Sequence, residues 1–179
     1  MKATGIVRRI DDLGRVVIPK EIRRTMRIRE GDPLEIYTTR DGEVIFKKYS
    51  LIGGLEDFAA QFCDTLARNT DFTAAVTDRD GIVAVAGAGK RELLGKSLSE
   101  ALSRVMEERR IYCCQGADQP LPVTDGNDRY TAAVAAPILC EGDVLGLVLF
   151  LSAEGQVPGE GEYKLAQTVS AFLGKHMES

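Results

Sequence analysis

Short apolar runs at strand spacing dominate residues 1–50. Runs of four or five residues rich in β-branched side chains and bounded by turn residues are typical of β-strands. Pro19 can occupy the first turn of a helix, and Ile22 and Met26 follow at i, i+4, so we expect a short helix that ends at Gly31. The predicted order is strand, strand, short helix, strand, strand, with the strands at 6–10, 15–18, 33–37 and 43–47.

Turn residues join these runs into two hairpins. Asp11-Asp12-Leu13-Gly14 separates the first pair, and Arg40-Asp41-Gly42 separates the second, where Asp-Gly is a strong hairpin signal. Fifty residues of this kind bury too little apolar surface to be secure as a monomer, and each hairpin leaves strand edges open. Dimerisation that closes a barrel would solve both problems.

A second periodicity begins after the junction at 48–50. Apolar residues recur at helical spacing over 51–68 and again over 165–176, although Gly53-Gly54 can delay the first helix. These two amphipathic helices are suited to pack together, within a subunit or between subunits.

The region between the two helices predicts an α+β domain. Residues 74–77 and 82–86 flank the turn sequence Asp78-Arg79-Asp80-Gly81, and a helical stretch follows over 92–102, with 105–110 as its extension. Two strongly apolar strands then meet at a turn over 140–143; they span 130–139 and 144–151. We therefore expect two domains, 1–50 and 51–179.

Charge divides the chain at the same place. Residues 1–50 hold 12 Lys/Arg and 8 Asp/Glu, whereas 51–179 hold 11 and 19, so the net charges are +4 and -8. Seven arginines lie between positions 3 and 29. Arginine suits DNA binding because its planar, always charged group donates paired hydrogen bonds to phosphates and base edges. The alternative is a solvated surface in which nearby acidic residues such as Asp11 and Glu21 pair with these cations.

The sequence blocks Thr4-Gly5-Ile6-Val7-Arg8, Asp12-Leu13-Gly14-Arg15-Val16-Val17-Ile18-Pro19 and Glu21-Ile22-Arg23-Arg24-Thr25 resemble the N-terminal DNA-binding domain of the AbrB-type transition-state regulators. The resemblance covers residues 2–48 and implies an all-β swapped-hairpin barrel formed by two interleaved chains. It also implies that double-stranded DNA is the partner. The implied DNA contacts are Arg8, Arg15, Arg23 and Arg24, with Arg9 and Lys2 as phosphate partners; Arg27 and Arg29 are expected to be ordinary surface residues.

The element order of 51–179 resembles a GAF domain, an α+β sensor module with flanking helices. Members of the AbrB family that carry such a domain act in sporulation, which implies a sporulation regulator. Two roles remain open for this domain: a sensor that binds a small-molecule effector in a cavity under the sheet, or an oligomerisation module that fixes a homotetramer. In both cases residues 1–50 would form the dimer.

Other candidate chemistry is weak. Cys63, Cys113, Cys114 and Cys140 match no zinc spacing, so we expect reduced and mostly buried thiols with no metal. Gly87-Ala88-Gly89-Lys90 lacks the full pattern of a phosphate loop and is expected to join a strand to a helix. Asp78 and Asp80 are expected to form a turn, and His176 to favour a helix end. No cofactor is expected.

Two alternative functions remain. One is an antitoxin-like protein that binds DNA and a partner protein, since such proteins share the swapped-hairpin fold. The other is a GAF-fold thiol enzyme that uses Cys113, Cys114 or Cys140. No apolar run approaches the 18 residues that a membrane span requires, and the opening residues have no signal-peptide pattern, so we expect a cytoplasmic, nucleoid-associated protein without a membrane partner.

Overall fold

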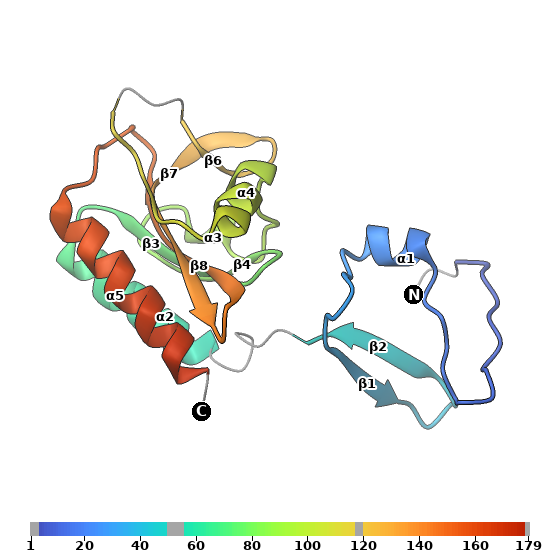
Figure 1. The fold of residues 1–179 in the computed structure, drawn as a ribbon. Coiled ribbons are helices and arrows are strands. Elements are labelled where there is room, and N and C mark those ends of the chain that lie inside the picture. Colours follow the sequence, from blue (N-terminus) through green and yellow to red (C-terminus); the bar gives the residue numbers. More distant parts are fainter. Residues whose placement is uncertain (1–3, 50–55, 117–119, 178–179) are drawn as a thin grey trace. The chain divides into compact units, whose positions relative to one another are not determined.

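The computed structural model describes residues 4–49, 56–116 and 120–177. The chain divides into two compact units, Met1–Tyr49 and Ser50–Ser179 (Figure 1). None of the described helices is long and apolar enough to cross a membrane.

The described part of the N-terminal unit, residues 4–49, contains one helix and one strand hairpin. Helix α1 spans Lys20–Thr25, and the antiparallel strands β1 (Leu34–Thr38) and β2 (Val44–Lys48) pair from Leu34 opposite Lys48 to Thr38 opposite Val44. Gly42 closes the turn with a φ of 82°, which glycine adopts without strain. This hairpin confirms the strands predicted over 33–37 and 43–47.

The predicted strands over 6–10 and 15–18 are wrong for the single chain. The turn between them forms, but the described residues before α1 have no strand. A strand requires a hydrogen-bonded neighbour, and a lone two-stranded hairpin is marginal in water. The helix also ends earlier than predicted, at Thr25, because Arg27 turns the chain with a φ of 51°; Gly31 makes a further turn with a φ of 83°.

This unit has almost no core of its own. Among residues 4–49 only Pro19 is buried. Large apolar side chains lie exposed instead, at fractions of 86% for Val7 and 70% for Val17; others that are at least 40% exposed are Ile6, Ile10, Leu13, Val16, Met26, Ile36, Tyr37, Val44 and Tyr49. Side chains that would form the interior of a stable domain therefore face solvent in the single chain.

The C-terminal unit is built around an antiparallel sheet with strand order β4-β3-β8-β7-β5 and β6 paired to β7. The two long central strands form the predicted hairpin. The strands are β3 (Thr73–Thr77), β4 (Ile82–Ala86), β5 (Tyr112–Cys113), β6 (Pro122–Thr124), β7 (Asn127–Cys140) and β8 (Asp143–Ser152).

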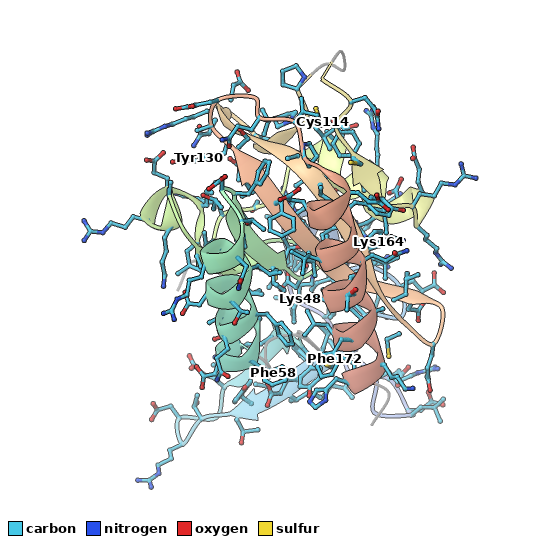
Figure 2. The ribbon with its side chains drawn as sticks, turned by 90° about the vertical axis from the view of Figure 1, so that its left-hand side faces the viewer. Lys48, Phe58, Cys114, Tyr130, Lys164 and Phe172 are labelled. Atoms are coloured by element: carbon cyan, nitrogen blue, oxygen red, sulfur yellow. The ribbon has the colours of Figure 1, made fainter. Side chains whose placement is uncertain are left out.

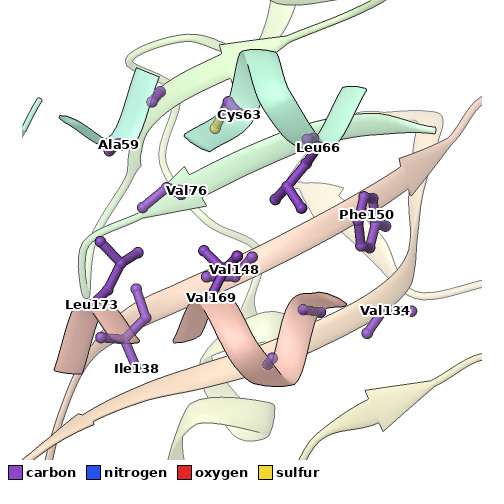
Figure 3. Packing of buried hydrophobic residues seen from close by; sticks show 14 of the residues in the cluster. Ala59, Cys63, Leu66, Val76, Val134, Ile138, Val148, Phe150, Val169 and Leu173 are labelled. Atoms are coloured by element: carbon purple, nitrogen blue, oxygen red, sulfur yellow. The ribbon is translucent and has the colours of Figure 1, made fainter. Parts of the chain in front are cut away.

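Helices cover both faces of this sheet. Helices α2 (Glu56–Asn69) and α5 (Glu160–His176) pack on one face, where Leu66, Phe150 and Leu173 share one core cluster (Figure 3). Helices α3 (Lys90–Leu93) and α4 (Glu100–Glu108) pack on the other, where Leu102 and Leu149 share a second cluster. Because neither face meets water, eight of the ten residues of β8 are buried, which explains its uninterrupted apolar run.

The two amphipathic helices pack against each other within one subunit. Helices α2 and α5 lie side by side, and Phe58 and Phe172 meet near one end of the pair with their ring centroids 6.1 Å apart (Figure 2). The predicted start of the first helix within 51–55 falls outside the described residues. Within the described part, the pair confirms the helical periodicity at both ends of the domain.

The single helical stretch predicted over 92–110 is instead two helices. Gly95, with a φ of 74°, breaks the path after α3. Ser99 then begins α4: its hydroxyl group accepts a hydrogen bond from the Leu102 N–H (3.1 Å), and its O–H donates one to the Pro122 carbonyl (2.6 Å). A capping serine at this position favours a new helix start over a continuous helix.

Candidate nucleic-acid interface

The turn before α1 fixes the position of Arg15. The Asp11 carboxylate accepts hydrogen bonds from the backbone N–H groups of Leu13 (3.0 Å) and Arg15 (2.7 Å), and its second oxygen accepts one from Arg15 Nε (2.8 Å). The Asp11 N–H donates to the Arg15 carbonyl at 3.0 Å, which closes the turn. One carboxylate therefore organises both the backbone and the guanidinium group.

These contacts favour the charged form of Asp11. The Arg15 backbone N–H contributes most, followed by the Arg15 side chain, and together they lower the pKa of the Asp11 carboxyl below its usual value. The Arg15 side chain is nevertheless 70% exposed. An exposed ion pair stabilises a fold little, so the guanidinium group can exchange this carboxylate for a phosphate at small cost.

Helix α1 carries Arg23 and Arg24 in its last turn. Pro19 stands at its N-terminal cap, and the Arg23 N–H donates to the Pro19 carbonyl at 2.9 Å. Arg24 is exposed, whereas Arg23 is half-buried and its buried Nε has no hydrogen-bond partner among the described residues. The two neighbouring arginines therefore have different surroundings, which the sequence pattern did not reveal.

The strand pair holds the end of α1. The Ile28 N–H donates to the Arg23 carbonyl at 2.7 Å, and Lys48 Nζ on β2 donates to the Arg27 carbonyl at 2.8 Å. The sequence does not reveal this role of Lys48, because a lysine at the end of a strand carries no signal of a distant backbone partner. The contact fixes the helix that carries Arg23 and Arg24 to the hairpin behind it.

The remaining predicted DNA contacts lie on the extended arm. Arg8 and Arg9 are exposed in the segment that leads to the Asp11 turn, and Lys2 falls outside the described residues. The Asp11 turn separates Arg8 and Arg9 on one arm from Arg15 on the other, while Arg23 and Arg24 share α1. All five arginines belong to the unit that lacks a core.

The weaker candidates of the second unit have structural roles. Gly89 precedes α3 in a strand-to-helix loop, as predicted, and a Cβ there would lie 2.4 Å from the Tyr130 ring, so Tyr130 fills the space beside this glycine. The Asp78 carboxylate accepts hydrogen bonds from the N–H groups of Asp80 and Gly81, which confirms its turn role. His176 ends α5, where its ring stacks on the Phe58 ring with the two ring centroids 5.3 Å apart.

The thiols are less buried than predicted. Cys63 is buried, but Cys113, Cys114 and Cys140 are half-buried. Burial raises the pKa of Cys63 to about 12 and also raises the pKa of Cys113. In the described part of the chain no group of three or more His, Cys, Asp or Glu residues could hold a metal ion.

Two family models match the chain. Residues 54–178 match the model described as stage V sporulation protein T C-terminal, transcription factor. Residues 7–51 match the model described as antidote-toxin recognition MazE, bacterial antitoxin.

Individual relatives match the same two parts. Stage V sporulation protein T of Bacillus subtilis is 49% identical over 178 residues, which is 99% of each chain. The transition state regulatory protein AbrB of Bacillus subtilis is 63% identical over 49 residues, 27% of this chain and 50% of that protein. A GAF domain of an Acinetobacter phosphoenolpyruvate-protein phosphotransferase covers 73% of this chain and 84% of its own at 15% identity and a TM-score of 0.55, a likeness of fold.

Proposed function

The chain belongs to the stage V sporulation protein T family of transcription factors, and we propose that it binds double-stranded DNA through an interleaved dimer of its N-terminal unit. One observation carries this proposal: five arginines and a set of large apolar side chains share a unit in which, among residues 4–49, a single chain buries only Pro19. Such a regulator acts on the chromosome, in the cytoplasm.

The exposed apolar residues support dimerisation. Val7 and Val17 lie on the two arms that flank the Asp11 turn, and both are at least 70% exposed. Burial of such side chains contributes roughly 1.5–3 kcal/mol each when complete. A second chain that pairs with these arms would complete the missing strands and supply the core together, which is the swapped-hairpin barrel that the family resemblance implies.

We assign the DNA contacts to Arg8, Arg15, Arg23 and Arg24, with Arg9 and Lys2 as phosphate partners. Two-fold symmetry would present each cation twice, so one dimer would offer a basic surface without a recognition helix of its own. Arginine can both neutralise phosphates and read base edges with paired donors. Among the described arginines of this set, Arg23 alone is half-buried.

Measuring operator affinity against salt concentration for Arg24→Ala tests this assignment. Each phosphate contact contributes about 0.9 to the slope of log affinity against log salt, and a dimer loses two contacts, so the slope should fall by about 1.8. Arg40→Ala is the matched control, because Arg40 is exposed in the β1–β2 turn of the same unit and carries no assigned contact. If Arg24→Ala keeps both the affinity and the slope of the unchanged protein, the assignment is wrong.

The C-terminal unit is proposed to join two such dimers into a tetramer. Phe58, Phe62, Phe172 and His176 form an aromatic cluster along α2 and α5, with centroid distances of 5.1–6.1 Å. Phe172 is 48% exposed despite its place in this cluster. A second copy of the helix pair would cover this apolar surface.

Sedimentation of Phe172→Asp tests the tetramer. The expected result is half the mass of the unchanged protein, because a charge at the interface would prevent the two helix pairs from meeting. Leu94→Asp is the control, since Leu94 is 45% exposed at the end of α3 on the opposite face of the sheet. An unchanged mass for Phe172→Asp would exclude this face as the interface.

An effector remains part of the proposal. Apolar side chains such as Leu98, Leu102 and Met106 fill the space between the sheet and α3–α4, which argues against a ligand cavity under this face. A thiol enzyme that uses Cys113 is disfavoured, because a nucleophilic cysteine requires a lowered pKa, whereas burial raises the pKa of Cys113.

The match of residues 7–51 to an antitoxin model favours one second candidate, a protein that binds DNA and a partner protein. Such proteins typically carry a disordered partner-binding tail, whereas the described parts of 56–177 form a packed unit with two core clusters. Limited proteolysis separates the two functions. A compact C-terminal fragment supports the regulator, and rapid digestion of this region supports the antitoxin.

A further inference from the structure

A groove with a volume of about 550 Å³ lies between α5 and the strand edge of β7. It exists because β5 is only two residues long: Tyr112 pairs with Ala135 and Cys113 with Val134. Further along β7, among the described residues, no strand pairs with this edge at Pro137–Leu139. The groove therefore follows from the shortness of β5.

The walls of the groove bring two cations together from distant parts of the sequence. Arg109 ends α4, and Lys175 lies in the last turn of α5. No lining residue is acidic, although residues 51–179 carry a net charge of -8. Within the described residues neither side chain forms an ion pair. A positive groove in an acidic domain is suited to an anion.

The backbone at Arg109 is unusual. It adopts a φ of 55° at the end of α4, a conformation in which glycine is the favoured residue. A non-glycine residue in this conformation carries backbone strain, and such strain often occurs at functional sites. At this position the chain has arginine in place of the favoured glycine, and so gains a guanidinium group at the groove.

The floor of the groove is apolar. Pro137 and Leu139 of β7 and Ala171 of α5 line it, and Leu139 is 42% exposed. Helix α5 can approach the strand closely because Gly174 has no side chain; a Cβ there would lie 2.0 Å from the Leu139 carbonyl oxygen. This close approach gives the groove an apolar base beside the two cations.

We propose that this groove binds a small organic anion: a carboxylate or phosphate head group held by Arg109 and Lys175, with an apolar body against Leu139 and Ala171. Its volume lies within the range of small-molecule sites, and the Gln167 amide adds a polar group at the wall. The site lies at the edge of the sheet beside α5 and the end of α4, and not in the filled space between the sheet and α3–α4. It deepens the proposed effector role, but ligand binding here does not depend on the DNA contacts.

Calorimetric titration of the full chain with sodium octanoate and with octyl phosphate tests the proposal. Both anions should bind, and the tighter one identifies the head group. Lys175→Gln and Arg109→Gly should each weaken binding about tenfold, since each removes a charge-assisted contact. Glycine suits the backbone at 109, so that variant should keep its fold. Lys164→Gln is the control, because Lys164 is exposed on α5, the helix that carries Lys175. This variant should bind both anions as the unchanged protein does.

Methyl NMR spectra of the full chain locate the site. Octanoate should shift the methyl signals of Ala171 and Leu139 and leave those of Leu98 and Met106, on the other face, in place. Ala171→Phe should fill the groove and abolish binding without a change of charge. The proposal is overturned if neither anion binds saturably, if octanol binds as tightly as octanoate, if the shifts map to Leu98 and Met106, or if the two charge variants bind normally.

Discussion

Replacement of Val17 by aspartate distinguishes a unit that works as a single chain from one that works as an interleaved dimer. Val17 is 70% exposed in the single chain and lies between the Asp11 turn and α1. At a surface position, a substitution of this kind typically changes the free energy of unfolding by no more than about 0.5 kcal/mol. If the unit worked as a single chain, Val17→Asp would therefore leave the free energy of unfolding almost unchanged.

The dimer predicts a large effect. Val17 is mostly exposed in the single chain and would become buried only in the dimer. Loss of this burial costs roughly 1.5 kcal/mol per chain. A carboxylate forced into the interface costs several kcal/mol more unless it finds a partner. Because two-fold symmetry applies each cost twice, dimer formation should weaken by at least about 5 kcal/mol, or more than about a thousandfold.

Sedimentation equilibrium and operator binding measure this effect together. Val17→Asp should halve the mass of the assembly and abolish operator binding. Val157→Asp is the matched control, because Val157 is 56% exposed in a loop of the C-terminal unit and receives the same change of charge. A Val17→Asp protein with the mass and operator affinity of the unchanged chain would refute the dimer. Val17→Thr, which adds no charge, separates loss of assembly from repulsion of DNA.

Three further results are expected. Gly174→Ala should lower the free energy of unfolding of the C-terminal unit by about 3 kcal/mol, because the new methyl group would overlap a β7 carbonyl. Gly161→Ala in the same helix meets open space and should raise the free energy of unfolding by up to about 1 kcal/mol. Thermal unfolding compares the two variants, and equal effects would contradict the packing of α5. The pKa of Asp11 is lowered in the folded chain, so the stability that its carboxylate gives the turn should be complete above its ordinary pKa of 3.8 and disappear as the pH falls through the lower folded value. NMR titration should show this loss at the Arg15 amide. A carboxyl group that titrates at its ordinary pKa would disprove the contact. Because burial raises the pKa of Cys63 to about 12, it should stay unmodified by a thiol reagent at pH 8 while the native fold persists, and rapid labelling in mass spectrometry would speak against its burial.

Local signals predicted the elements that depend on near neighbours. The Asp41-Gly42 turn and the apolar runs beside it predicted β1 and β2, and helical spacing predicted α2 and α5. The break between α3 and α4 was missed, because apolar spacing continues across it while Ser99 makes its deciding contact with Pro122, 23 residues away. A pattern within one segment contains no information about such a partner.

The sequence by itself determined the strand and helix periodicities, the division into a basic and an acidic part, and the arginine-rich stretch with its family resemblance, since all of these depend on residue types at short spacing. Only the tertiary structure decided how each side chain is used. It left the strands at 6–10 and 15–18 without partners, distinguished the half-buried Arg23 from the exposed Arg24, and brought Arg109 to the same groove as Lys175. The physical reason is that burial and juxtaposition depend on contacts between residues far apart in the chain, which no local pattern specifies.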